Sequence, residues 1–205
     1  MLNGYLINLV KFLVCIDKIS SFDKKAIDVG NTPLDVYTLC SCIREVFCLS
    51  YAIRKENEFY ILINQKKLLL KLIGQNLRYL GSDERSQAIL LLKALELEKT
   101  IPYDMWIKST PGIFIKKLID LEYLFSIINE KNIRAFIIDD KNPNKIAAYK
   151  INNQDIIILD EFRDNNFIQR QIGNFERIAL PNHYSLENKI LYINYQLDQQ
   201  QLPIL

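Results

Sequence analysis

DIIILD, residues 155–160, is the stretch of sequence that decides the fold, because four aliphatic residues follow one another between two aspartates. A continuous apolar run of this length is typical of a strand that is buried on both faces, as in a parallel sheet. On both sides of this run, segments with strand patterns alternate with segments with helix patterns. This order favours an α/β fold with a mostly parallel sheet and helices on both faces.

The other elements follow from hydrophobic periodicity and from turn residues. We expect strands at residues 4–16, 58–63, 68–73, 112–118, 133–139, 155–160 and 176–180. We expect helices at residues 35–53, 82–97, 119–131, 165–172 and from 185 onward, and a loop at residues 17–33. Ser82 and Ser185 are the residues that we expect to cap two of these helices. The chain of 205 residues fits one domain, residues 1–205.

Composition excludes several classes of protein. Hydrophobic residues make up 49% of the chain and charged residues 24%, as in an ordinary globular protein. The net charge of +2 is too small to indicate nucleic-acid binding by itself. The sequence lacks the glycine-rich patterns of dinucleotide and P-loop sites. The apolar stretch at residues 5–16 is too short to span a membrane and lacks a signal-peptide cleavage site.

Four cysteines, Cys15, Cys40, Cys42 and Cys48, have no zinc-binding spacing, and His183 is the single histidine. We therefore interpret these cysteines as small buried residues in a reducing cytosol, and we expect a cytoplasmic protein without a metal site. A ligand of a parallel sheet binds beyond the carboxyl ends of the strands, which places it at the loops after residues 139, 160 and 180. The pair Asp139–Asp140 in the first of these loops could hold a ribose or a metal, although a turn is the more common role.

Basic residues gather with aromatic residues in the first half of the chain. They are Arg44, Arg54, Lys55, Lys66, Lys67, Lys71 and Arg78, with Tyr51, Tyr60 and Tyr79 among them. Such a mixture suits contacts with an RNA backbone and stacking on RNA bases. It equally suits an ordinary solvated surface, and the sequence leaves both interpretations open.

Three stretches in the middle of the chain carry a resemblance to a known family. They are LSYAIRKENEFYILI (residues 49–63), KLIGQNLRYLGSDERSQAILLLKAL (residues 71–95) and STPGIFIKKL (residues 109–118). In the same order and at similar spacing, they resemble the archaeal TrmY family of tRNA pseudouridine methyltransferases and its bacterial relatives. That family belongs to the SPOUT class of knotted methyltransferases.

The resemblance implies an S-adenosylmethionine-dependent methyltransferase that acts on nitrogen-1 of the T-loop pseudouridine of tRNA, at position 54. It also implies a homodimer and a C-terminal trefoil knot at about residues 133–198. It assigns the handling of the proton to Asp35, and RNA binding or support of the active-site framework to Arg54 and Arg85. Together with the basic pattern, this gives Arg54, Lys55, Arg78 and Arg85 as the residues that we expect to bind RNA. The residues that it assigns to the cofactor are Phe136, Leu159, Asp160, Leu180, Pro181, Leu186 and Lys189.

The last third of the chain departs from the family pattern. Leu159 stands where the family has a glycine, and Lys189 stands where the family has a cysteine. Asp35 aligns with the family's acid only after a two-residue shift, and it could instead serve as a first-turn residue of its helix. Arg85 could equally be held by Asp83 or Glu84. The alternative to an active enzyme is therefore a relative that binds RNA without a working cofactor site.

Overall fold

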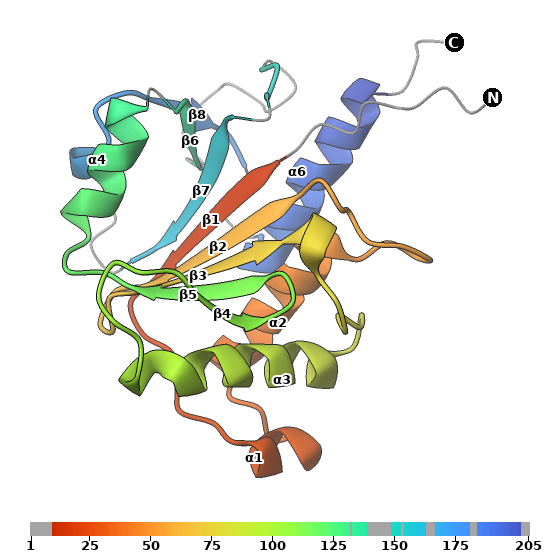
Figure 1. The fold of residues 1–205 in the computed structure, drawn as a ribbon. Helices are drawn as coiled ribbons and strands as arrows, with labels where there is room; N and C mark the ends of the chain where they lie inside the picture. The colour runs from red at the N-terminus through yellow and green to blue at the C-terminus, as the bar shows by residue number, and fades with distance from the viewer. Residues whose placement is uncertain are drawn as a thin grey trace.

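A computed structural model describes residues 10–131, 133–138, 149–152, 154–162, 167–180 and 184–201 of the chain. All the described strands join one sheet of eight strands, in the order β4-β5-β3-β2-β1-β7-β6-β8. The strands are β1 (Lys11–Ile16), β2 (Glu58–Ile63), β3 (Leu68–Ile73), β4 (Ile107–Thr110), β5 (Ile113–Lys117), β6 (Ala135–Ile138), β7 (Ile156–Glu161) and β8 (Phe175–Ile178). The sheet and its helices are shown in Figure 1.

The sheet has a parallel half and an antiparallel half. Strands β2, β1, β7, β6 and β8 run parallel to their neighbours, whereas β3, β5 and β4 extend the sheet beyond β2 in antiparallel pairs. The stretch DIIILD forms β7 at the centre of the parallel half, between β1 and β6. The prediction of a mostly parallel α/β sheet is therefore correct for the half that contains β7.

Helices cover the two faces of the sheet unequally. The helices are α1 (Lys24–Asp28), α2 (Leu34–Phe47), α3 (Glu84–Leu95), α4 (Glu122–Glu130), α5 (Phe167–Gln171) and α6 (Leu186–Gln201), with short 3₁₀ turns η1 (Gly74–Asn76) and η2 (Glu96–Lys99). Helices α2, α3 and α6 pack on one face through a large core that contains Phe12, Phe59 and Leu159. Helices α4 and α5 pack on the other face, over Leu13 and Ile158. Alternate strand residues point to opposite faces, so each buried strand serves both cores.

Several predicted boundaries were wrong, for identifiable reasons. The helix expected to reach residue 53 ends at Phe47, because the Phe47 carbonyl accepts the Arg54 N–H and the chain folds back in a bridge between Cys48 and Ile53. Asp83 caps α3 in place of the predicted Ser82, and its side chain accepts the N–H of Ser86 at 2.8 Å.

Two short elements were missed. Helix α1 lies inside the segment predicted to be a loop, and the side chain of Asp23 caps it by accepting the N–H of Ala26 at 2.7 Å. Strand β4 has a broken register with β5 between Lys108 and Thr110, so its hydrophobic pattern does not alternate cleanly. The strands predicted at residues 58–63 and 68–73 are confirmed at both ends.

Candidate active site

The carboxyl ends of β1, β7, β6 and β8 lie at one edge of the sheet, because these strands are parallel. Helix α2 follows β1 and helix α6 follows β8, so both helices begin near this edge. Crevices at the carboxyl ends of parallel strands are where α/β proteins bind their ligands. This carboxyl edge is therefore the candidate active site.

Asp35 lies in the first turn of α2, where its carboxylate holds the loop that follows β1. One oxygen, Oδ2, accepts the backbone N–H of Ser20 at 2.6 Å, and Oδ1 accepts the N–H of Val36 at 2.9 Å. Within the described part of the chain, these bonds occupy two of the lone-pair positions of the carboxylate and leave the others available. Asp35 therefore has a clear structural role, and its predicted handling of a proton stays a prediction.

The end of β7 carries two carboxylates. Asp160 accepts the backbone N–H of Phe162 at 2.9 Å, which shapes the start of the following loop. Glu161 forms an ion pair with Lys189, with 3.5 Å between Oε1 and Nζ. Since Lys189 lies in the first turns of α6, this pair joins the beginning of α6 to the end of β7.

The apolar residues predicted to contact the cofactor belong to the core beside this edge. Leu159 has only 1% of its surface exposed and packs beneath α2 and α6. Phe136 is fully buried, and its ring lies 5.3 Å from that of Tyr149. Leu180 and Leu186 are also buried, at the entrance to α6. Pro181 and the pair Asp139–Asp140 lie outside the described residues, as does His183.

Cys15 of β1 lies beside this edge, where it pairs in register with Asp160 of β7. Burial raises the pKa of Cys15 well above its ordinary value, and the charge of Asp160 raises it further. The thiol therefore remains protonated and is a poor nucleophile. Among the described residues, no group of three or more histidine, cysteine, aspartate or glutamate side chains is arranged to hold a metal ion.

Three of the four residues predicted to bind RNA are held by hydrogen bonds within the chain. Arg54 binds Asp198 through two hydrogen bonds, and Arg85 binds Asp28 at 2.8 and 3.1 Å. Arg78 donates to the carbonyl of Leu77, whereas Lys55 is exposed. Arg54 precedes the amino end of β2, at the end of the sheet opposite to the carboxyl edge. Their predicted contacts with RNA stay a prediction.

The glycines of the family motifs form a scaffold. Gly112, with φ of +82°, lies in the turn between β4 and β5, and its carbonyl accepts the N–H of Ile73 at 2.9 Å. A Cβ atom at Gly112 would lie 2.5 Å from the backbone N of Leu77. The second and third motif stretches therefore meet at one point, which explains why glycine is needed in this turn.

Sequence reasoning missed a second hollow, on the sheet face that α4 covers only in part. Lys71 and Tyr60, from the basic and aromatic cluster, lie in it together with Trp106, Lys116 and Tyr123. The signal for the last three was weak, because they come from separate elements and no local pattern links them.

A family profile matches nearly the whole chain. The family described as "Putative SAM-dependent RNA methyltransferase" matches residues 17–201. The chain belongs to this family. This match confirms the resemblance that the three motif stretches carry. The matched residues also include those of the carboxyl edge.

Several curated relatives of the chain are archaeal proteins. A tRNA (pseudouridine(54)-N(1))-methyltransferase of Methanococcus maripaludis strain C7 is 31% identical over 130 residues, which are 62% of this chain and 57% of that protein. An enzyme of the same name from strain C5 is 27% identical over 173 residues, 78% of this chain and 83% of that protein. For the enzyme of Methanocaldococcus jannaschii, with 38% identity over 87 residues, the match spans 42% of its length. The chain thus matches about half the length of several of these relatives.

The fold is similar to that of an archaeal protein of known crystal structure. Archaeoglobus fulgidus Nep1, whose crystal structure contains S-adenosylhomocysteine, superimposes with a TM-score of 0.56 and 14% identity. The superposition covers 94% of this chain and 96% of Nep1. At this identity, the likeness concerns the fold.

Proposed function

We propose that this chain transfers a methyl group from S-adenosylmethionine to nitrogen-1 of a pseudouridine in tRNA, at position 54. The match of the family profile to residues 17–201 carries this proposal, because it includes both the motif stretches and the carboxyl edge. The names of the curated relatives support the choice of nucleotide.

The residues at the carboxyl edge fit such a cofactor chemically. Nucleoside sites are mostly apolar with a few polar groups, and Leu180 and Leu186 would supply apolar surface for the adenine. Asp160 and Glu161 end a parallel strand, where carboxylates are suited to accept bonds from ribose hydroxyls. Lys189 would bring a positive charge close to the carboxylate of the methionine part. The cofactor, when bound, supplies an electrophilic methyl group.

The chain itself must orient the base and receive its proton. Nitrogen-1 of pseudouridine carries a proton, which has to leave for the nitrogen to act as a nucleophile. We propose Asp35 as the acceptor, because its carboxylate lies at the carboxyl edge and has free lone pairs. The bonds from the N–H groups of Ser20 and Val36 would fix its direction, which favours a defined approach of the base.

The alternative is a relative without a working cofactor site, and the position of Leu159 bears on it. A leucine in place of glycine would obstruct the cofactor if its side chain pointed out of the sheet edge. The side chain instead packs under α2 and α6 with 1% of its surface exposed. This packing supports an active methyltransferase over a relative without a working cofactor site.

The decisive experiment compares two T-arm transcripts that differ at one nucleotide. The purified protein is incubated with S-adenosylmethionine and a transcript that carries either pseudouridine or uridine at the target position. Nucleoside mass spectrometry should detect methylpseudouridine from the first transcript and no methylated nucleoside from the second. Equal labelling of both, or none of either at saturating cofactor, would contradict the proposal.

We further propose that residues 1–205 act as one domain, with a C-terminal knot at about 133–198, in a cytoplasmic homodimer. The single sheet that joins all described strands supports one domain. The likeness to Nep1 supports a fold of the expected class. Within the described part of the chain, no helix is long and apolar enough to cross a membrane. A crystal structure that traces residues 139–148 and 181–183 would test the knot.

A further inference from the structure

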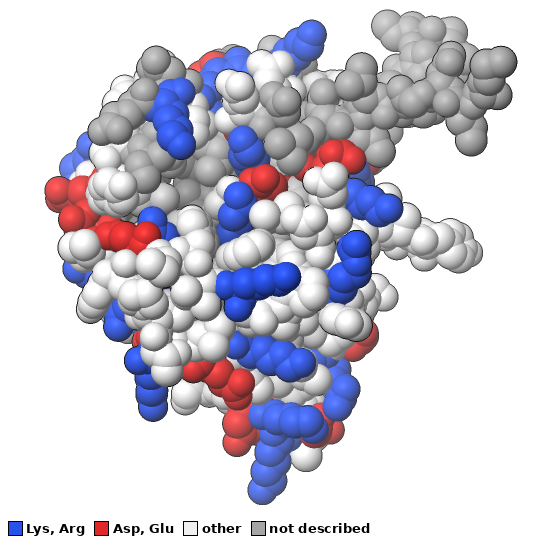
Figure 2. Space-filling model, viewed as in Figure 1, with Lys and Arg blue, Asp and Glu red and all other residues white. Residues whose placement is uncertain are grey.

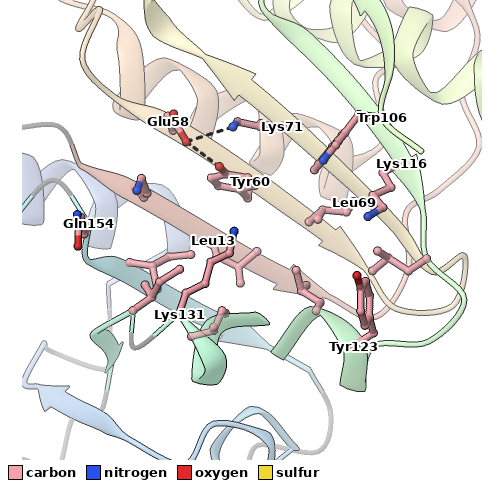
Figure 3. A pocket seen from close by; sticks show the side chains of 16 residues that line it. Leu13, Glu58, Tyr60, Leu69, Lys71, Trp106, Lys116, Tyr123, Lys131 and Gln154 are labelled. Atoms are coloured by element: carbon pink, nitrogen blue, oxygen red, sulfur yellow. Dashed lines mark hydrogen bonds and ion pairs between the residues drawn. The ribbon is translucent and has the colours of Figure 1, made fainter. Parts of the chain in front are cut away.

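A groove of about 680 Å³ lies on the face of the sheet that carries α4, and it is distinct from the carboxyl edge. It is lined by residues of β1, β2, β3, β5 and β7 together with residues of α4. Figure 3 shows the groove with its side chains. Apolar side chains line much of it, among them Leu13 and Leu69, and lysines and aromatic rings lie beside them.

Positive charge dominates the groove. Four lysines line it, Lys11, Lys71, Lys116 and Lys131, against a single acid, Glu58. Glu58 accepts the hydroxyl of Tyr60 at 2.6 Å and pairs with Lys71 at 3.5 Å. Burial, and then the bond to Glu58, raise the pKa of Tyr60, so that its hydroxyl remains a donor. The one acid of the groove is therefore already bound.

Two of the lysines are available to a ligand. Lys116 lies 3.6 Å from Asp104, which is just outside the groove. Lys11 and Lys131 form no ion pair with any other residue that the structure describes. Figure 2 shows the same excess of blue side chains as a band down the middle of this face. A surface of this kind attracts a polyanion.

Aromatic rings accompany the lysines. The Nζ atom of Lys116 lies 5.9 Å from the ring centre of Trp106 and 5.8 Å from that of Tyr123. Both rings keep a large exposed surface, 39% for Trp106 and 50% for Tyr123. Lysines that alternate with exposed rings suit a nucleic-acid strand, whose phosphates bind the cations and whose bases stack on the rings.

We propose that this groove binds a single-stranded or looped segment of RNA, with phosphates on Lys11, Lys71, Lys116 and Lys131 and a base against Trp106 or Tyr123. This inference rests on the proposed function for the identity of the polyanion. A second copy of the chain is a less favourable occupant of the groove. A two-fold contact would place the lysines of one copy opposite those of the other, and their positive charges would repel. The groove would thus hold the tRNA outside the carboxyl edge, while the target nucleotide reaches that edge.

The sole tryptophan of the chain makes the proposal directly measurable. The emission of Trp106 reports on this groove alone. Titration of the full-length protein with a T-arm transcript, without cofactor, should quench this emission with saturation. The affinity from the quenching should agree with that from the anisotropy of a labelled transcript.

A pair of matched double variants tests the lysines. Lys11→Gln with Lys131→Gln removes the two groove charges that have no ion pair among the described residues, so folding should be preserved. The control is Lys93→Gln with Lys99→Gln, which removes two exposed lysines from α3 and η2. We expect the groove variant to bind the transcript roughly tenfold more weakly, with a salt dependence reduced by about 1.5 in slope, and the control to match the wild type.

A stacking variant and a kinetic measurement complete the test. Trp106→Ala should weaken binding about tenfold by anisotropy. In methyl transfer, the groove variant should raise the KM for RNA and leave kcat unchanged, since the groove does not contact the reacting atoms. Binding that responds as expected without any methyl transfer would contradict the proposed function and leave the groove assignment intact.

Two results would overturn the groove assignment. One is equal RNA affinity in the groove variant, the control variant and the wild type, with unchanged Trp106 emission. The other is emission that changes with protein concentration alone, together with a dimer that Trp106→Ala dissociates, because the groove would then hold a second copy of the chain.

Discussion

Arg54 and Asp198 lie 144 residues apart in the chain, and two hydrogen bonds of 2.8 and 2.6 Å join them. The guanidinium binds both carboxylate oxygens, which is the strongest geometry for this kind of pair. Arg54 belongs to the first motif stretch, and Asp198 lies near the end of α6. The pair therefore fastens the last helix to the loop that precedes β2, and it gives Arg54 a structural role.

Replacement of Asp198 by Asn should lower the free energy of unfolding by about 1–2 kcal/mol. Charged hydrogen bonds contribute more than this when buried, but Asp198 is 43% exposed and solvent screens the pair. Denaturant unfolding measures the change. Lys55→Gln, at the exposed neighbour of Arg54, is the control and should change stability by less than about 0.5 kcal/mol. Equal stability of D198N and wild type would contradict a role for the pair.

Gly112→Ala should destabilise the protein by at least about 2 kcal/mol. A φ of +82° is unfavourable for alanine, and the new Cβ would lie 2.5 Å from the backbone N of Leu77, where no flexible side chain can give way. Gly173→Ala is the matched control, because a Cβ there meets nothing within 4 Å. Thermal unfolding should separate the two variants clearly. Similar melting temperatures would mean that the turn between β4 and β5 adjusts freely.

The parts of the fold that sequence could predict are those in which local pattern and tertiary packing agree. The run at β7 is apolar because both of its faces are buried, so its strand state and its central place could be inferred together. The end of α2 could not be inferred, because it depends on the Phe47 carbonyl binding the N–H of Arg54. The hydrophobic periodicity of the sequence continues through residues 48–53, so it gives no sign of that hydrogen bond.

The candidate site was predictable to a smaller extent. Parallel strands place their carboxyl ends together, so the edge that holds Asp160 and Lys189 followed from the topology. The motif residues Arg54 and Gly112 were conspicuous in the sequence, yet the structure gives them roles in the scaffold. The groove with Trp106 and Lys116 could not be predicted from the sequence. It depends on how much of the sheet α4 covers, and no local sequence pattern encodes that.

Alkaline pH should destabilise the protein through its buried thiols. Burial, and to a smaller extent the charge of Glu84, raise the pKa of Cys40 from the ordinary 9.0 to about 12, and the pKa of Cys42 is also raised. Between pH 9 and 12 the unfolded chain therefore loses thiol protons that the folded chain keeps. The stability is fully present below pH 9 and decreases as the pH rises, by about 1.4 kcal/mol per pH unit for each such thiol.

The variant Cys40→Ala isolates one of these thiols. Urea unfolding is measured at several pH values above 9, with a reducing agent present. The free energy of unfolding should decrease less steeply with pH in the variant than in the wild type, by the slope that corresponds to one proton. The absolute stability of the variant does not matter, since the test concerns the slope. Identical slopes would show that Cys40 ionises as readily in the folded protein as in the unfolded chain.

We propose α6 as the contact of the proposed homodimer, with Leu191 and Tyr195 at its centre. These residues are one turn apart on α6, and they are 49% and 54% exposed in the single chain. Leu191→Glu should convert a dimer to a monomer, because the charge would have to be buried without a partner. Light scattering during size exclusion measures the mass. Val29→Glu, at an exposed apolar residue after α1, is the control, and a Leu191→Glu protein that stays dimeric would contradict this interface.

Asp35→Asn should lower kcat for methyl transfer about 100-fold, because asparagine cannot accept the proton from nitrogen-1. The amide oxygen of asparagine can keep one of the two backbone bonds, that from Ser20 or that from Val36, whereas its NH2 group cannot accept the other. Asp23→Asn is the matched control, since Asp23 likewise lies at the start of a helix and accepts a backbone N–H, that of Ala26. Thermal unfolding of both variants measures the structural cost of each change, and a fall in kcat at a temperature where both variants are folded separates catalysis from capping. If kcat falls equally in the two variants, Asp35 only positions the loop after β1, and another group receives the proton.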